Sequence, residues 1–275
     1  MRPLLLLFAL LFTVSATHAS VPFLPTSPPE VSDTTLHQLA PNRTWVKKHH
    51  TLLVGAASAI AVTGFFIGSY QQYDRPIMTF AQQHRNAFTN ETARLVQPLG
   101  TALPLHATFA TMFTIGAVAR RPKLREAAVV GLASFYVNAL VTDQLKKNFQ
   151  RYRPCVTQDS HLFDGASGAG QNTSLPSSHT SNAFAAASVI SSVYHDSEWV
   201  PPVAYGVATL VGLSRINDNK HWASDVLAGA TIGYLTGKAT YWGYQRLKGH
   251  LSGPRIQLTP AWQNGSPGMA AFVRF

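Results

Sequence analysis

Between Thr51 and His250 the sequence is a succession of apolar segments, each long enough for a helix and separated by short polar stretches. Most are apolar almost throughout, whereas the second mixes polar and apolar positions, which is typical of an amphipathic helix. The predicted helices cover residues 51–70, 75–97, 101–119, 125–150, 179–195, 201–214 and 221–247. This pattern predicts an all-α fold, a bundle of about six helices.

Composition narrows the class of protein. Of 275 residues, 46% are hydrophobic and only 12% are charged, a charged fraction about half of that usual in soluble domains. A disordered chain is excluded, because disorder requires few apolar residues and many charges. The formal net charge of +10 favours acidic partners such as phosphate esters, anionic lipid or nucleic acid. Cys155 is the single cysteine, so an internal disulfide is excluded.

The first residues have the pattern of a secretory signal peptide. Arg2 supplies a positive charge, residues 4–14 form an apolar run, and small residues precede Ala19. We therefore predict a signal peptide at 1–19 and export of the chain. The alternative is an uncleaved membrane anchor, although the apolar run is shorter than the ~20 residues that a span needs. Residues 20–50 are rich in proline and predict a linker.

The C-terminal residues differ from the helical domain predicted at 51–250. Residues 255–259 alternate between polar and apolar side chains, Asn264-Gly265 is a turn signal, and residues 269–275 form a second strand candidate. A short C-terminal β-hairpin or tail is therefore predicted for residues 251–275.

Three segments within the helical domain carry chemically useful side chains. The first contains Lys146 and, seven residues later, Arg153 followed by Pro154. Proline disfavours helix at the residue before it, so the helix must end close to Arg153. The second has Ser177 and Ser178 directly before His179. Either serine suits a helix N-cap, whose free backbone N–H groups bind anions.

The third segment contains Ser214-Arg215, His221 and Asp225. If His221 and Asp225 lie on one helix, their spacing of four puts them on the same face. The carboxylate then accepts the imidazole N–H, fixes the tautomer and stabilises the imidazolium. Arg215 adds a planar guanidinium that suits phosphate. Taken alone, each segment also fits an ordinary role as a solvated charge, a helix cap or a surface pair.

In this order, the three segments resemble the motifs of the type 2 phosphatidic acid phosphatase superfamily. That superfamily includes bacterial acid phosphatases, lipid phosphate phosphatases and vanadium haloperoxidases. Its pattern of K-x6-R-P, P-S-G-H and S-R-x5-H-x3-D is met at every position except the glycine, where Ser178 stands. The resemblance covers about residues 146–225 and implies a helical bundle with the active site at one end.

The resemblance also implies a role for each matched residue. His221 is expected to be the nucleophile that forms a phosphohistidine, Asp225 its orienting partner, and His179 the general acid. The expected phosphate-binding groups are Lys146, Arg153, Ser177, Ser178 and Arg215. Three cationic side chains stabilise the phosphoryl oxygens without a metal. No metal and no cofactor are therefore expected.

The implied function is metal-independent hydrolysis of a phosphomonoester or diphosphate. The substrate classes left open are a lipid phosphate, a prenyl diphosphate and a small soluble ester. One alternative is a vanadate-dependent haloperoxidase with His221 bound to vanadate, and the short chain argues against it. Another is a non-catalytic anion-binding protein, against which the intact His179, His221 and Asp225 argue.

The expected partner is a phosphorylated substrate, with contact to a membrane surface left open. No nucleic acid is expected, because the basic residues 120–125 have no recognised reader motif beside them. The site is predicted on the periplasmic side, in a soluble or loosely membrane-associated protein. The alternative is an integral inner-membrane enzyme, favoured by basic residues at the end of the bundle opposite the site.

Overall fold

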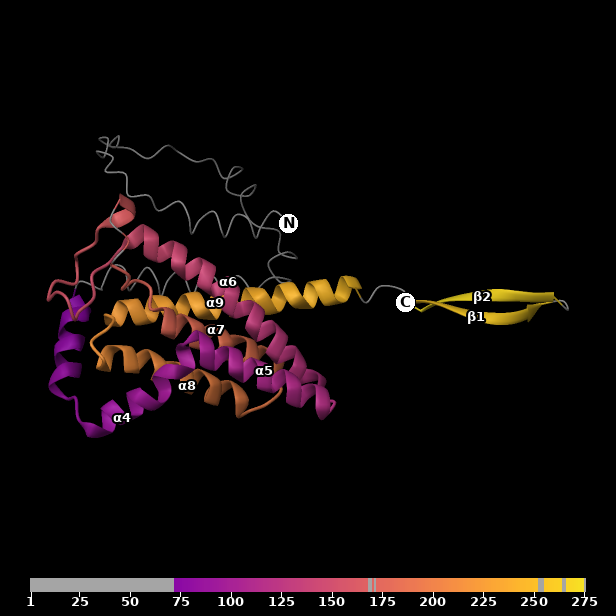
Figure 1. Ribbon diagram of the computed structural model, residues 1–275, viewed down its shortest axis with the longest axis horizontal. Coiled ribbons are helices and arrows are strands. Elements are labelled where there is room, and N and C mark those ends of the chain that lie inside the picture. The colour runs from indigo at the N-terminus through magenta and orange to yellow at the C-terminus, as the bar shows by residue number, and fades with distance from the viewer. Residues whose placement is uncertain (1–71, 168–169, 171, 252–254, 264–265, 275) are drawn as a thin grey trace, which may run out of the picture. The chain divides into compact units, whose positions relative to one another are not determined.

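The computed structural model describes residues 72–167, 170, 172–251, 255–263 and 266–274 (Figure 1). The predicted signal peptide at 1–19, the linker at 20–50 and the apolar segment at 51–70 lie outside the described residues. The division of the chain before residue 72 therefore stays a prediction.

The described chain is helical from residue 72 to Leu251, which confirms the all-α class of this part. After a helix at 72–83 come α4 (Ala87–Val96), η1 (Gln97–Gly100), α5 (Ala102–Val118), α6 (Pro122–Phe149), η2 (Gly165–Ser167), α7 (Ser178–Val193), α8 (Val200–Asn217) and α9 (Ala223–Leu251). The number of helices in the bundle also depends on residues before 72, so it too stays a prediction.

Two strands follow α9. They are β1 (Arg255–Gln263) and β2 (Ser266–Arg274), which pair antiparallel with Ile256 opposite Val273. The predicted turn at Asn264-Gly265 lies outside the described residues.

The single helix predicted at 75–97 is wrong, because the chain breaks between residue 83 and Ala87. Asn86 caps α4: its side chain accepts the Thr89 N–H at 3.0 Å, and the Thr89 hydroxyl oxygen accepts the Asn86 N–H at 3.1 Å. This reciprocal capping box stabilises a new helix start. Pro98 then lies in the 3-10 turn η1, where the chain bends by 65° into α5.

Helix α7 is the centre of the bundle and packs against α6, α8 and α9 (Figure 1). Its buried residues are mostly alanine and serine. Helix α9 approaches α7 closely at Gly229, Gly233 and Gly237, where a Cβ at Gly233 would lie only 2.1 Å from the Ser181 carbonyl oxygen. Glycines four residues apart let two helix backbones come together in this way. As a result, the first turns of α7 and α9 lie side by side.

A polar cluster ties the same helices together further along. The Asn138 side-chain oxygen on α6 accepts from the hydroxyls of Ser181 on α7 and Thr236 on α9. Its amide nitrogen donates to the Asn182 side-chain oxygen at 2.7 Å. Asn138 and Ser181 are fully buried, so these bonds satisfy groups that cost free energy when left unpaired.

The outer surface of the helices, in contrast, is apolar. Large exposed hydrophobic side chains include Leu103, Phe113, Ile115 and Val118 on α5, Val129, Tyr136 and Leu140 on α6, and Val203, Leu210 and Leu213 on α8. Among the described residues α6 is long and apolar enough to cross a membrane, and the bent pair of residues 87–100 and 102–118 passes the same test as one broken span.

The close α7–α9 contact predicts the effect of a methyl group. Gly233→Ala should lower the free energy of unfolding by about 1–3 kcal/mol, because the new Cβ overlaps the α7 backbone. Gly243→Ala, on the same helix with open space around it, is the matched control and should be neutral or stabilising by up to about 1 kcal/mol. Thermal unfolding of both variants checks this. Equal melting temperatures would contradict the close approach.

Candidate active site

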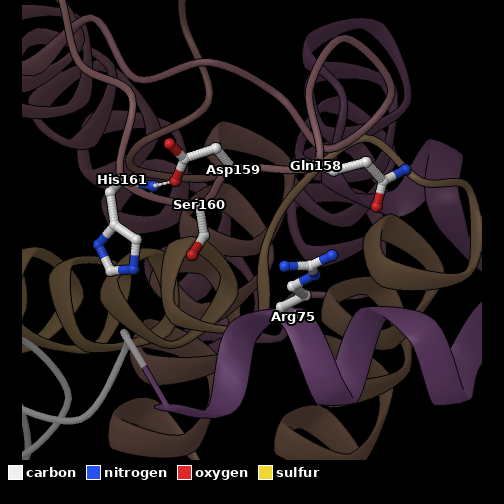
Figure 2. A pocket seen from close by; sticks show the side chains of 5 residues that line it. All are labelled: Arg75, Gln158, Asp159, Ser160 and His161. Atoms are coloured by element: carbon white, nitrogen blue, oxygen red, sulfur yellow. Dashed lines mark hydrogen bonds between the residues drawn. The ribbon is translucent and has the colours of Figure 1, made fainter.

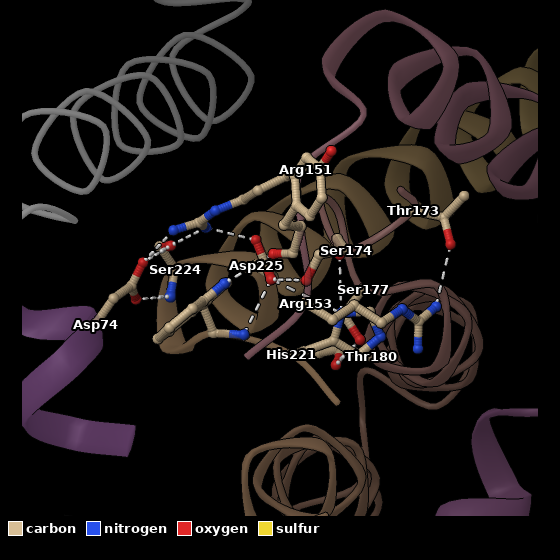
Figure 3. A network of polar contacts seen from close by, with 12 residues as sticks. Asp74, Arg151, Arg153, Thr173, Ser174, Ser177, Thr180, His221, Ser224 and Asp225 are labelled. Atoms are coloured by element: carbon tan, nitrogen blue, oxygen red, sulfur yellow. Dashed lines mark hydrogen bonds and ion pairs between the residues drawn. The ribbon is translucent and has the colours of Figure 1, made fainter. Parts of the chain in front are cut away.

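Two cations of the first motif segment meet at the loop before α7. Lys146, in the last turn of α6, donates to the Thr173 carbonyl oxygen at 2.5 Å. Arg153, just beyond the helix, donates to the Thr173 hydroxyl oxygen at 3.1 Å (Figure 3). Helix α6 ends at Phe149, earlier than Pro154 requires, with Gln150 in the left-handed region at φ 46°. This turn directs the chain back across the end of the bundle.

His221 is held in place by the end of α8. Asn219, at φ 55°, turns the chain so that the N–H groups of Lys220 and His221 both donate to the Arg215 carbonyl oxygen, at 3.1 and 3.3 Å. The His221 ring is buried, with Nδ1 2.8 Å from the Ser174 carbonyl oxygen. Because a carbonyl oxygen only accepts, Nδ1 carries the proton of the neutral ring. The lone pair is therefore on Nε2, the nitrogen available for attack.

Asp225 lies within ion-pair distance of the His221 ring, but the direct hydrogen bond expected from the four-residue spacing is not formed. Its Oδ2 lies 3.8 Å from His221 Nδ1, beyond hydrogen-bond range. Because α9 begins at Ala223, His221 precedes the helix and the two residues are not one helical turn apart. Asp225 Oδ2 instead accepts from the Ser174 hydroxyl and, at 2.9 Å, from the Trp222 N–H. Ser174 thus links the carboxylate to the imidazole.

The electrostatics keep this pair in the protonation states that nucleophilic attack needs. Burial lowers the pKa of His221, although Asp225 opposes the shift. Burial alone would raise the pKa of Asp225, but the His221 ring, the Arg151 guanidinium and the Ser174 hydroxyl keep it below its usual value. At neutral pH the ring is therefore neutral and the carboxylate is ionised.

His179 is the second residue of α7 and is half-buried, with Nε2 3.2 Å from the Gln97 side-chain nitrogen. Burial, and after it the charges of Arg215, His221, Lys146 and Arg153, together lower its pKa to about 4. Without an anion nearby, His179 is therefore unprotonated at neutral pH.

Arg215 has one N–H group that is open to a ligand. Its Nη1 donates to Asp218 at 2.8 Å, while its buried Nε has no hydrogen-bond partner in the part of the chain that the structure describes. A buried guanidinium N–H without a partner is costly unless a further acceptor binds there. An anionic oxygen meets that requirement.

Ser177 is the N-cap of α7, but its side chain makes no capping bond. Its hydroxyl oxygen accepts from the Thr180 hydroxyl at 3.0 Å, and its N–H donates to the Asp225 carbonyl oxygen at 3.1 Å. Ser178, the residue that replaces glycine in the motif, is the first residue of α7 and is half-buried. The positive end of the α7 dipole therefore lies beside the start of α9.

Sequence analysis missed several residues that contact this site, among them Asp74, Gln97, Arg151 and Ser174. Arg151 lies within the first motif, between Lys146 and Arg153. Its place inside the motif is the feature of the sequence that could have indicated a role in the site. The other three lie outside the motifs, and Asp74 is more than 70 residues before the first of them. Cys155 is exposed and makes no contact that assigns it a role.

Two cavities lie near the site, and neither is lined by the motif histidines. Figure 2 shows the first, about 400 Å³, lined by Arg75, Gln158, Asp159, Ser160 and His161. The second, about 390 Å³, is mainly apolar and lies between the helix at 72–83, α4 and α8, with Ser214 in its wall. It therefore borders the residue directly before Arg215.

Comparison with known proteins agrees with the motif resemblance. Residues 126–248 match the family model described as the PAP2 superfamily, and this range contains every motif residue from Lys146 to Asp225. A curated relative, the lipid A 1-phosphatase of Porphyromonas gingivalis, is 49% identical over 70 residues, which are 25% of this chain and 16% of the relative. The match thus spans less than a fifth of that protein's length.

Two solved structures resemble the fold. A transmembrane PAP2 type phosphatidylglycerolphosphate phosphatase from Bacillus subtilis matches with a TM-score of 0.52 and 22% identity, covering 71% of this chain and 96% of the other. This similarity supports the fold alone. Aquifex aeolicus LpxE matches with a TM-score of 0.48 and 18% identity, covering 62% of this chain and 96% of the other, too weakly to support an argument.

The charges around His179 predict how it responds to a bound anion. Phosphate or vanadate among Lys146, Arg153 and Arg215 should raise the pKa of His179 from about 4, because negative charge stabilises the imidazolium. A histidine ring titration by NMR, with and without the anion, measures this shift. His195, just beyond the far end of α7, serves as an internal control whose signal should not respond to the anion. An unchanged His179 pKa would contradict anion binding here.

Proposed function

Because residues 126–248 belong to the PAP2 superfamily, we propose that the chain is a lipid phosphate phosphatase that works through a phosphohistidine on His221. The observation that carries the proposal is the meeting of two histidines and three cations at one end of the bundle. Lys146, Arg153 and His221 bind the adjacent residues Thr173 and Ser174. Arg215 holds the His221 backbone through its carbonyl oxygen.

In the proposed first step, His221 Nε2 attacks the phosphorus atom. The P–N bond forms while the bond from phosphorus to the leaving oxygen breaks. Lys146, Arg153 and Arg215 stabilise the charge on the equatorial oxygens, which is the main requirement of phosphoryl transfer. Positive charge that develops on the His221 ring is stabilised by the Asp225 carboxylate, whose Oδ2 lies 3.8 Å from His221 Nδ1.

His179 supplies the proton for the leaving oxygen. In the free protein its pKa of about 4 leaves it unprotonated at neutral pH. The substrate dianion offsets the cations that depress this pKa, so the ring takes up a proton when substrate binds. In the second step His179 accepts a proton from water, the water oxygen binds phosphorus, and the P–N bond breaks. Phosphate is released, and His179 gives the proton that it accepted from water to the solvent as the anion leaves. Both histidines are then in their initial states.

A lipid is the substrate class that the surface favours. The exposed faces of α5, α6 and α8 are apolar, as expected for helices that contact acyl chains. Two of the similar proteins named above are, by name, a lipid A 1-phosphatase and a phosphatidylglycerolphosphate phosphatase. A prenyl diphosphate and a small soluble ester are the less favoured substrates.

We propose that the protein is integral to the membrane, the alternative in the sequence analysis, with its site on the periplasmic side. Helix α6 is the span that length and composition support among the described residues, and its site end carries Lys146. Its other end begins directly after Arg120 and Arg121 and carries Lys123 in its first turn, a basic segment typical of the cytoplasmic side.

The proposed function predicts phosphate release from lipid phosphates in the presence of EDTA. The full chain in detergent should hydrolyse lipid A 1-phosphate, phosphatidic acid or phosphatidylglycerolphosphate, with vanadate as an inhibitor because it occupies the phosphate site. A prenyl diphosphate and 4-nitrophenyl phosphate complete the panel and test the other substrate classes. Loss of activity in EDTA that a divalent ion restores would contradict the metal-independent mechanism.

Replacement of each of the two histidines should block a different step of the reaction. His221→Ala should abolish the phosphoenzyme with every substrate, because no nucleophile remains. His179→Ala should lower turnover by roughly 10²–10⁴-fold for an alkyl phosphate, which needs leaving-group protonation, and much less for 4-nitrophenyl phosphate. Trapping of labelled phosphoenzyme without acid measures the first effect. A phosphohistidine in His221→Ala that disappears in His179→Ala would reverse the two roles.

A further inference from the structure

A buried ion cluster lies behind His221 and has no place in the mechanism above. Arg151 is its centre: Nη1 donates to Asp225 Oδ1 at 2.6 Å, and Nη2 donates to Asp74 Oδ2 at 2.7 Å (Figure 3). All three side chains are at most 1% exposed. The guanidinium thus bridges a carboxylate of the site and one from the helix at 72–83.

Asp74 also accepts two hydrogen bonds from Ser224. Its Oδ1 accepts the Ser224 N–H at 2.8 Å, and its Oδ2 accepts the Ser224 hydroxyl at 2.5 Å. Ser224 is in the first turn of α9, where unpaired N–H groups and the helix dipole favour a negative charge. Asp74 therefore caps from another helix the same turn that carries Asp225.

The charges of this cluster do not cancel. Among the described residues it consists of two carboxylates and one guanidinium, a formal charge of −1. Buried ions of this kind cost several kcal/mol each to desolvate, so removal of one partner is strongly destabilising. Arg151 alone would neutralise Asp225 and remove its influence on His221. Asp74 restores the negative charge.

This charge acts on His221 across a short distance, since Asp225 Oδ2 lies 3.8 Å from His221 Nδ1, and Ser174 holds both side chains in place. The Ser174 hydroxyl donates to Asp225 Oδ2, and its carbonyl oxygen accepts from His221 Nδ1 at 2.8 Å. Burial, Lys146 and Arg153 act in the opposite direction and lower the pKa of His221. The cluster is the one negative element among the described groups that act on His221.

We propose, on the basis of the proposed function, that Asp74 and Arg151 are positioning residues for His221. Arg151 joins Asp74 to Asp225, and Asp74 offsets the guanidinium so that the Asp225 charge still stabilises the imidazolium formed during attack. The Ser174 hydroxyl and the Trp222 N–H hold the Asp225 carboxylate in place independently of Arg151.

Asp74→Asn is the first test. It should lower kcat about tenfold, a loss of transition-state stabilisation, with KM within about twofold because the cationic clamp is unchanged. The acid limb of kcat/KM should move to lower pH by about one unit, because less negative charge disfavours the His221 imidazolium. A merely structural loosening would admit water and move the limb to higher pH. Asp196→Asn, in the exposed pair with Lys123, is the control and should change nothing.

The double variant Asp74→Asn/Arg151→Met is the second test, because it removes one charge of each sign and leaves Asp225 ionised. It should be faster than Asp74→Asn alone, a reversal that additive structural damage does not give. A folded double variant that is equal to or slower than the single variant would overturn the inference. If the single variant does not fold, the double variant should form phosphoenzyme within about tenfold of the wild-type rate. A larger loss would overturn it.

The same assays separate this inference from the proposed function. Wild-type protein that hydrolyses no lipid phosphate and forms no phosphoenzyme contradicts the proposed function. Active wild-type protein with an Asp74→Asn variant of unchanged kcat and pH profile contradicts the inference alone.

Discussion

The site depends on the close packing of α7 against α9. Gly229, Gly233 and Gly237 remove the side chains that would keep the two backbones apart. Because of this approach, the Ser177 N–H donates to the Asp225 carbonyl oxygen, and the helix starts are joined directly. His179 follows one start and His221 precedes the other. Without the glycine face, the two histidines would not share a site.

The bundle buries many small and polar residues and exposes many large apolar side chains. Its centre holds hydrogen-bonded polar side chains such as Asn138 beside apolar clusters that include Phe109 and Trp222, whereas other large apolar side chains lie on the outside. Packing of small residues and interhelical hydrogen bonds are the interactions that join helices in lipid, in agreement with the proposed membrane location. The same outer surface favours a lipid as substrate, so fold and proposed function have a common physical origin.

Opposite charges act on His221. Burial, Lys146 and Arg153 lower the pKa of its ring, and Asp225, paired with Arg151, raises it. In the proposed mechanism, the first group keeps the ring neutral before attack, and the carboxylates favour the charge that develops during it. Ser174 contacts both His221 and Asp225, and the motifs do not include it.

The sequence by itself determined the all-α class of the described part and most helix positions, and it singled out the motif residues from Lys146 to Asp225 as candidates for a site. It could do so because apolar periodicity and motif spacing are local properties. It did not reveal the break before Ala87, where a capping box outweighs the continuous amphipathic pattern. Only the tertiary structure decided that Ser174 rather than Asp225 accepts the hydrogen bond from His221, and that Asp74 pairs with Arg151. These partners come from separate elements, and hydrogen bonds and ion pairs depend on distances that only the packed helices set.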